Sequence, residues 1–146
     1  MNTQIGNGLV EDTSTAESII EQIADAIIYA DADGIIRWWN YAAAALFGYS
    51  ADEALGQKLD LIIPEHLRAA HWRGFEAAMA KGVMKLQGRP TVTRATHQVG
   101  RKLYIEMTFA LVKGEAGAVC GAVAVARDVT ERVEQQRAKT HPGVGE

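Results

Sequence analysis

Two stretches of the chain place apolar residues at the helical spacing of three to four. Residues 14–23 (STAESIIEQI) begin with the Ser-x-x-Glu pattern of a capping box and continue with isoleucines on one face, which predicts a helix of about ten residues. Farther along, Leu67, His71 and Phe75 recur one turn apart, which predicts a longer helix that Gly82 ends. We expect the face that carries His71 to look toward the sheet.

Two shorter helices are predicted between these stretches. Asn40 precedes an alanine-rich run that Gly48 ends, and Ser50 with Glu53 repeats the capping-box spacing before Gly56. Asn and Ser side chains accept hydrogen bonds from the first free amides of a helix, and glycine tolerates the left-handed backbone that ends one. We therefore expect two helices of about one to two turns in series.

Alternation of apolar and polar residues predicts five strands. Residues 26–30 and 35–39 flank the turn sequence DADG, and Asp-Gly between two β-rich runs is a strong hairpin signal. Residues 91–96, 103–112 and 119–126 follow, separated by turns, and the small residues of the last run suit a central strand. Hairpin-linked strands predict an antiparallel sheet, with the short helices on one face.

The same alternation assigns side chains to the two faces of the sheet. Trp38 and Trp39 are adjacent, so they must point to opposite faces, one into the core and the other toward the N-terminal helix or a partner. Within 103–112, one face carries Tyr104, Glu106 and Thr108, and the other carries Leu103, Ile105, Met107 and Phe109. An aromatic side chain on the outer face would suit a dimer interface.

Composition narrows the possible functions. The chain has 146 residues, 48% of them hydrophobic, and a net charge of −3 without a basic cluster, which fits one domain and argues against nucleic acid as the main partner. A single cysteine excludes an internal disulfide. No apolar run is long enough to span a membrane, and neither a signal peptide nor a common catalytic motif is present. We therefore expect a soluble, cytoplasmic protein.

Two long stretches together resemble the PAS domain family. They are residues 24–57, ADAIIYADADGIIRWWNYAAAALFGYSADEALGQ, and residues 110–136, ALVKGEAGAVCGAVAVARDVTERVEQQ, and the likeness extends over about residues 15–135. It implies an α+β PAS fold: a five-stranded antiparallel sheet with short helices on one face, an N-terminal flanking helix and a C-terminal signalling helix. It also implies a sensory or interaction module rather than an enzyme, with a pocket between sheet and helices that binds a small ligand or none.

The resemblance divides the chain into four parts. Residues 1–13 are expected to be a mobile N-terminal tail, residues 14–128 the PAS domain with its N-terminal cap helix, residues 129–138 the C-terminal signalling helix, and residues 139–146 a disordered tail. The Asp-x-x-Glu spacing that begins at Asp128 would cap the signalling helix. Such a cap would couple the end of the last strand to the start of that helix.

The phrase PEHLRAAHWRGF, residues 64–75, resembles that of heme-binding PAS oxygen sensors, in which a histidine ligates the heme iron. His71 stands at that position, so the resemblance implies heme b and the sensing of a diatomic gas or a redox state. An imidazole can ligate iron through one nitrogen while the other bonds a backbone carbonyl. The alternative is a histidine that caps or packs locally, as in PAS domains without heme.

An arginine on the next strand of those sensors bonds the gas or a heme propionate. Arg89 lies in a similar phrase, but an ungapped count from His71 places Thr91 there instead. Two residues apart on one strand, both would share a face. Otherwise Arg89 is a solvated charge. Pro90 between them removes a ladder donor and indicates an edge strand or a bulge.

Further residues are expected to line the pocket or to form the core beside it. They are Leu67, Phe75, Ile105, Met107 and Phe109. Met107 is also a candidate second axial ligand. Cys120 lies outside the helix phrase used by flavin-photoadduct relatives, and we expect a buried, inert thiol.

Two other hypotheses stay open. In the first, the chain is a cofactor-free PAS module that forms a homodimer through the outer sheet face and flanking helices and acts on a downstream signalling protein, with no nucleic-acid or membrane partner. In the second, the pocket binds a flavin, an organic acid or a lipid.

Overall fold

A computed structural model describes residues 14–84 and 88–140, which form one antiparallel sheet with helices packed on it. The five strands lie in the order β2-β1-β5-β4-β3, and residues 14–22 are helical. The bounds are β1 Ala26–Asp31, β2 Ile36–Trp39, α2 Tyr41–Phe47, α3 Ala51–Ala54, α4 Arg68–Lys81, β3 Thr91–Thr96, β4 Lys102–Lys113, β5 Val119–Asp128 and α5 Thr130–Thr140. The predicted fold class and element order are confirmed, and the tail expected over 1–13 lies outside the described residues.

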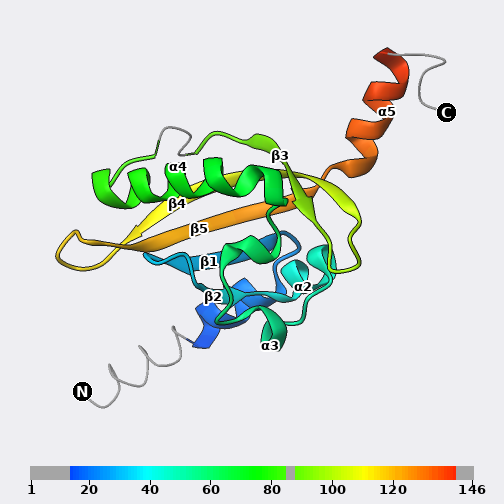
Figure 1. Ribbon diagram of the computed structural model, residues 1–146. Coiled ribbons are helices and arrows are strands. Elements are labelled where there is room, and N and C mark those ends of the chain that lie inside the picture. Colours follow the sequence, from blue (N-terminus) through cyan, green and yellow to red (C-terminus); the bar gives the residue numbers. More distant parts are fainter. Residues whose placement is uncertain (1–13, 85–87, 141–146) are drawn as a thin grey trace.

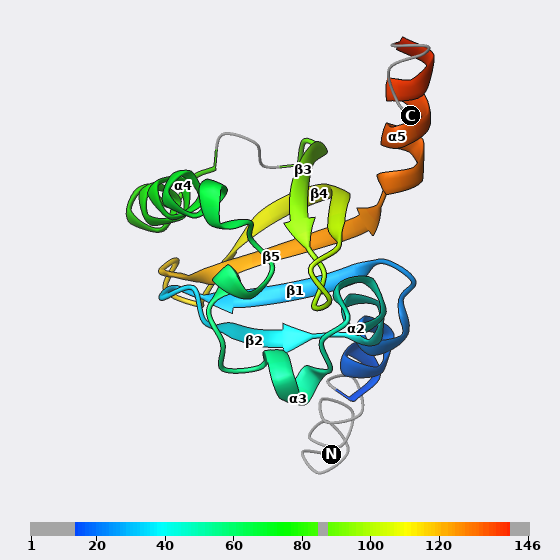
Figure 2. The same cartoon turned by 45° about the vertical axis from the view of Figure 1, so that its right-hand side comes forward.

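The helices lie to one side of the sheet, while α5 projects away from it (Figures 1 and 2). β5 is the central strand, between β1 and β4, as its small residues indicated. Gly121 shows why size matters there, because a Cβ atom at this position would overlap the carbonyl oxygen of Ala30 on β1.

The inner face of the sheet is the core side. Leu103, Ile105 and Met107 of β4 are buried there together with Phe47 of α2 and Trp39 of β2. The predicted alternation along β4 is therefore confirmed. Adjacent Trp38 lies on the outer face, opposite Tyr29, as expected for neighbouring residues of a strand.

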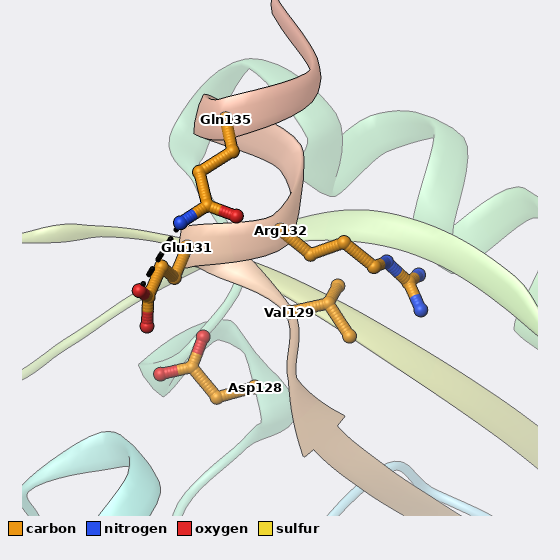
Figure 3. Close-up of a pocket in the computed structure, with 5 residues that line it drawn as sticks. All are labelled: Asp128, Val129, Glu131, Arg132 and Gln135. Carbon is orange, nitrogen blue, oxygen red and sulfur yellow. Dashed lines mark hydrogen bonds between the residues drawn. The ribbon is translucent and has the colours of Figure 1, made fainter.

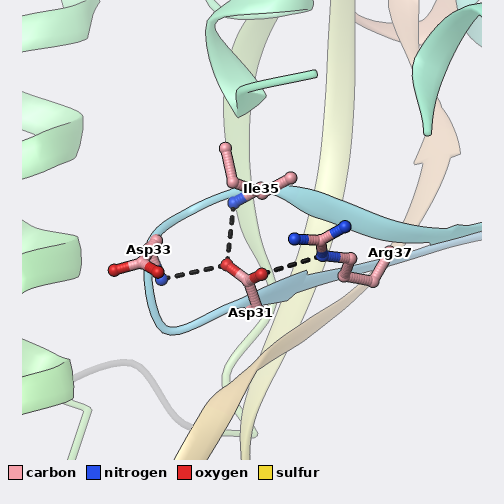
Figure 4. A network of polar contacts seen from close by, with 4 residues as sticks. All are labelled: Asp31, Asp33, Ile35 and Arg37. Atoms are coloured by element: carbon pink, nitrogen blue, oxygen red, sulfur yellow. Dashed lines mark hydrogen bonds and ion pairs between the residues drawn. The ribbon is translucent and has the colours of Figure 1, made fainter. Parts of the chain in front are cut away.

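The β1–β2 turn is held by one carboxylate (Figure 4). Asp31 Oδ1 accepts hydrogen bonds from the backbone amides of Asp33 and Ile35, and its Oδ2 pairs with Arg37 Nε at 2.8 Å. Desolvation works to raise the pKa of Asp31, but the bonds from Arg37, Ile35 and Asp33 outweigh it and lower that pKa below its usual value. The Asp31 side chain therefore stabilises the turn by bonding backbone amides that follow it in the chain.

Asn40 does more than the predicted helix cap. Its buried amide accepts from the amides of Ala43 and Ile27, both at 2.9 Å, and donates to the carbonyls of Ile20 and Asp25 at 2.8 and 3.0 Å. One side chain thereby joins the N-terminal helix, β1 and α2. Its two donor hydrogens and its carbonyl oxygen are fully used.

Three local expectations are wrong. Ser14 already lies within the N-terminal helix rather than before it. Residues 139 and 140 are helical, because α5 continues to Thr140 and its last turn carries Arg137 and Lys139, which favour a helix C-terminus. Cys120 is exposed, not buried, since it lies at the hairpin end of β5, beside Gly114 and beyond the core.

We predict that Asn40→Ala lowers the free energy of unfolding by about 3 kcal/mol or more, because buried amides and carbonyls of three elements lose their partner. Urea denaturation followed by circular dichroism measures the change. Ser50→Ala is the control, since Ser50 caps α3 in an exposed capping box and should cost only about 1 kcal/mol. Equal losses in the two variants would contradict the special role of Asn40.

Candidate functional site

The helix α4 carries His71, the candidate metal-ligating residue, and contacts the sheet region near both of its ends. Near its start, the Trp72 ring packs against Gly34 of the β1–β2 turn, and at its end Gly82 lies next to Val119 of β5. Gly82 adopts the left-handed conformation that ends the helix, as predicted. Two short 3₁₀ turns, Leu59–Leu61 and Glu65–Leu67, lead into α4.

His71 is half-buried on α4 among aromatic rings. Its ring centroid lies 4.8 Å from that of Trp72, edge to face, and 5.9 Å from that of Phe75. Its Nδ1 atom is buried and has no hydrogen-bond partner, so the expected bond from this nitrogen to a backbone carbonyl is not present.

The electrostatic setting favours the neutral form of His71. Burial lowers the pKa of His71, and the nearby charge of Asp60 opposes this shift without cancelling it. A neutral imidazole has a free lone pair on one nitrogen, which is the form that ligates metals. The site therefore combines a side chain that is able to ligate a metal with two neighbouring aromatic rings.

Arg89 and Thr91, the candidate ligand-binding residues on either side of Pro90, differ in exposure and in secondary structure. Arg89 is exposed and precedes β3, so the expectation that it shares a strand face with Thr91 is wrong. Thr91 begins β3, is half-buried and pairs with Met107 on the inner face. β3 is an edge strand, as Pro90 indicated.

The other residues predicted to line the pocket are either buried in the core or half-buried. Ile105 and Met107 belong to the buried core, with exposures of 1% and 7%. Phe109 on β4 is half-buried and packs against this core. Leu67 and Phe75, on the helical side, are also half-buried but are not part of the core. Contact of any of these side chains with a ligand stays a prediction.

Two surface hollows lie elsewhere in the described chain. One, of about 490 Å³, lies at the root of α5 among Asp128, Val129, Glu131, Arg132 and Gln135 (Figure 3). The other, of about 430 Å³, is lined by Tyr49, Gln57, Lys58, Asp60, Leu61 and Arg68. Among residues 14–84 and 88–140, no group of three or more His, Cys, Asp and Glu side chains could hold a metal ion. No helix in these same residues is long and apolar enough to cross a membrane.

The exit from the sheet is bonded to β4. Asp128 Oδ1 accepts from the Thr130 amide at 2.9 Å, which confirms the predicted cap, whereas Glu131 accepts from Gln135 instead of completing a capping box. The Thr130 hydroxyl accepts from the Tyr104 amide at 2.9 Å and donates to the Tyr104 carbonyl at 3.4 Å. The Arg137 guanidinium lies 5.0 Å from the Tyr104 ring centre, within cation–π range.

Sequence patterns did not reveal two long-range contacts, the one between Tyr104 and Thr130 and the one between Asp60 and Trp72. Tyr104 and Thr130 are 26 residues apart, and no local periodicity links them. Asp60 accepts a hydrogen bond from Trp72 Nε1 at 2.7 Å, across 12 residues of chain. The Asp-x-Thr spacing at 128–130 is the one available signal, because Ser, Thr and Asp side chains favour bonds to nearby backbone groups.

Comparison with known proteins identifies similar chains. A family model described as PAS fold matches residues 20–134. The sensor protein FixL of Bradyrhizobium diazoefficiens is 38% identical over 68 residues, which are 47% of this chain and 14% of that protein. The oxygen sensor protein DosP of Escherichia coli is 26% identical over 117 residues, 80% of this chain and 14% of that protein. The chain thus matches only a small part of either relative's length.

Solved structures agree on the fold. The PAS domain of a protein from Colwellia psychrerythraea aligns with a TM-score of 0.72 at 24% identity, covering 82% of this chain and 98% of that one. An RNA-binding light-oxygen-voltage receptor aligns with a TM-score of 0.69 at 25% identity, covering 88% of this chain and 36% of that one.

We predict that Thr130→Val loosens α5, because the Tyr104 amide and carbonyl both lose a partner, at a cost of about 1 kcal/mol. Hydrogen exchange of the α5 amides should become faster, while that of β1 and β5 should not change. Thr140→Val is the matched control, since the Thr140 hydroxyl donates to the Gln136 carbonyl within the same helix. If both variants leave α5 exchange as in the parent chain, the hydroxyl bridge does not hold the helix.

Proposed function

We propose, from the premise that this chain belongs to the PAS family, that it is a sensory module which binds heme b through His71 and passes a change of that site to α5. The observation that carries the proposal is the setting of the His71 ring: it lies against the rings of Trp72 and Phe75, its buried Nδ1 lacks a partner, and burial lowers its pKa. When bound, the heme would supply an iron centre able to bind a diatomic gas or to change redox state.

The residues present fit this group on the side of α4. His71 offers one nitrogen ligand, and half-buried Leu67, Phe75 and Phe109 offer apolar surface for a large, flat, hydrophobic ligand. On the sheet side we assign Thr91 rather than Arg89 to the ligand wall, because Arg89 is exposed outside the strand. We assign no iron bond to Met107, whose side chain is already packed in the core.

The similar proteins support this choice among possible ligands. The relative that is 38% identical over 68 residues is the sensor protein FixL, and another relative is the oxygen sensor protein DosP. A flavin, an organic acid or a lipid is the alternative occupant of the same space, and the test below separates them.

Titration of hemin into the purified protein, followed by the Soret absorption band, tests the assignment. We predict binding by the parent chain and a loss of at least about 100-fold in affinity for His71→Ala, since even changes to groups behind a metal ligand cost about 10–100-fold. His66→Ala is the control, because His66 is exposed in the turn before α4.

Either of two results would overturn the heme assignment. In the first, the parent chain gives no Soret band with hemin, and a flavin or lipid co-purifies instead. In the second, His71→Ala binds hemin as tightly as the parent chain and with the same spectrum, which would leave His71 as a packing residue.

A second function rests on the outer face of the sheet. Half-buried apolar side chains gather there from β1, β2 and β5, namely Ile27, Tyr29, Trp38, Val123 and Val125. The buried Nε1 of Trp38 has no partner in the described chain. Ile19 of the N-terminal helix is 59% exposed, and Ile23, just after that helix, is 44% exposed. We propose that a second copy of the chain covers this surface, since an uncharged apolar patch suits a self-complementary interface.

We predict a dimer at micromolar concentration that Trp38→Arg weakens at least about tenfold, because aromatic side chains dominate such interfaces. Sedimentation equilibrium measures the dissociation constant. Val99→Arg, at a turn position that is 78% exposed, is the control and should leave it unchanged. A parent chain that stays monomeric would remove the dimer hypothesis without touching the heme assignment.

A further inference from the structure

Asp60 contacts α4 at two positions one helical turn apart. Its carboxylate Oδ1 accepts from Trp72 Nε1 at 2.7 Å, and its backbone carbonyl accepts from Arg68 Nη2 at 3.2 Å. Arg68 Nε also donates to the Ile63 carbonyl at 3.0 Å. The short 3₁₀ turn that contains Asp60 is therefore hydrogen-bonded to the first part of α4.

Trp72 is held on a second side by packing. Its six-membered ring lies so close to Gly34, at φ +80° in the β1–β2 turn, that any Cβ atom there would overlap it. Its ring centroid is also 5.4 Å from that of Phe75, edge to face. The indole is thus fixed between the turn, the Asp60 carboxylate and its own helix.

The core contributes little to holding this part of α4. Ala78 is the one fully buried residue of the helix, and it lies near the other end. The central hydrophobic cluster of the described chain draws its members from the sheet, α2, α3 and the segment before α4, with none from α4 itself. The orientation of the N-terminal half of α4 therefore depends on the contacts of Arg68 and Trp72.

We infer that Asp60 and Trp72 are positioning residues for His71, which they hold at a fixed rotation of α4. Successive residues of an α-helix point about 100° apart around its axis, so pinning the Trp72 side chain sets the direction of the neighbouring His71 side chain. The inference rests on the proposed function only in taking His71 as the ligand. It adds a positioning group to that site, because binding of a ligand through His71 then depends on the carboxylate of Asp60, 11 residues earlier in the chain.

Three variants separate the effect of the Asp60–Trp72 hydrogen bond from the effects of the Asp60 charge and of the Trp72 ring. Asp60→Asn keeps an oxygen acceptor for Trp72 Nε1 and removes the charge, Asp60→Ala removes the acceptor, and Trp72→Phe keeps a ring but removes the donor. Asp33→Ala is the control, because Asp33 is an exposed acid whose side chain is not needed for the turn bond that its backbone donates.

Two readouts are taken on each folded variant. In the heme-free protein, NMR measures nuclear Overhauser contacts between the ring of residue 72 and Gly34, which report the rotation of α4 against the β1–β2 turn, and the exchange of the α4 amides. With hemin, absorption and electron paramagnetic resonance spectra give the affinity and the iron coordination. We expect Asp60→Ala and Trp72→Phe to lose the ring contacts and about 10–100-fold in hemin affinity, the size of effect seen for groups behind a metal ligand. Asp60→Asn and Asp33→Ala should stay within about threefold of the parent chain.

The inference is overturned if Asp60→Ala and Trp72→Phe keep the ring contacts, or if Asp60→Asn falls as far as Asp60→Ala, which would make charge rather than the hydrogen bond responsible. Should one of the two disruptive variants fail to fold, the other decides. A parent chain that binds no hemin removes the proposed function, while the NMR contacts still decide whether Asp60 and Trp72 orient His71.

Discussion

The buried side chain of Asn40 is the interaction on which the rest of the structure depends. It lies where the N-terminal helix, β1 and α2 meet, and it satisfies backbone groups of all three. In an apolar interior an unpaired amide or carbonyl is costly, so these elements can be buried together only with such a side chain among them. The placement of α2 then directs the following chain over the inner face of the sheet.

Two places farther along the chain matter for the proposed function. One is α4, where the polar contacts of Asp60 and the wedge of Trp72 against Gly34 orient the helix that bears His71. The other is the junction of β5 with α5, where Thr130 bridges to Tyr104. β4 belongs both to the core and to this junction, because its inner face enters the core through Met107 while its outer face carries Tyr104. A displacement of this strand would therefore reach α5 directly.

Local features were predictable from the sequence, and long-range contacts were not. The β1–β2 hairpin, the caps at Asn40 and Ser50 and the two faces of β4 follow from turn chemistry and periodicity within a few residues. The bond between Asp60 and Trp72 depends on how separate segments pack, which no period in the sequence encodes. Arg89 was misplaced for the same reason, since strand β3 begins at Thr91 and leaves it outside.

The central claim is that His71 is a ligand held in place by Asp60 and Trp72. A crystal structure of the protein grown with hemin tests it most directly. The account predicts a heme between α4 and the sheet, an iron–nitrogen bond to His71, and Trp72 Nε1 still donating to Asp60. A heme held through another side chain, or a His71 ring turned away from the iron with the Asp60–Trp72 bond intact, would contradict it.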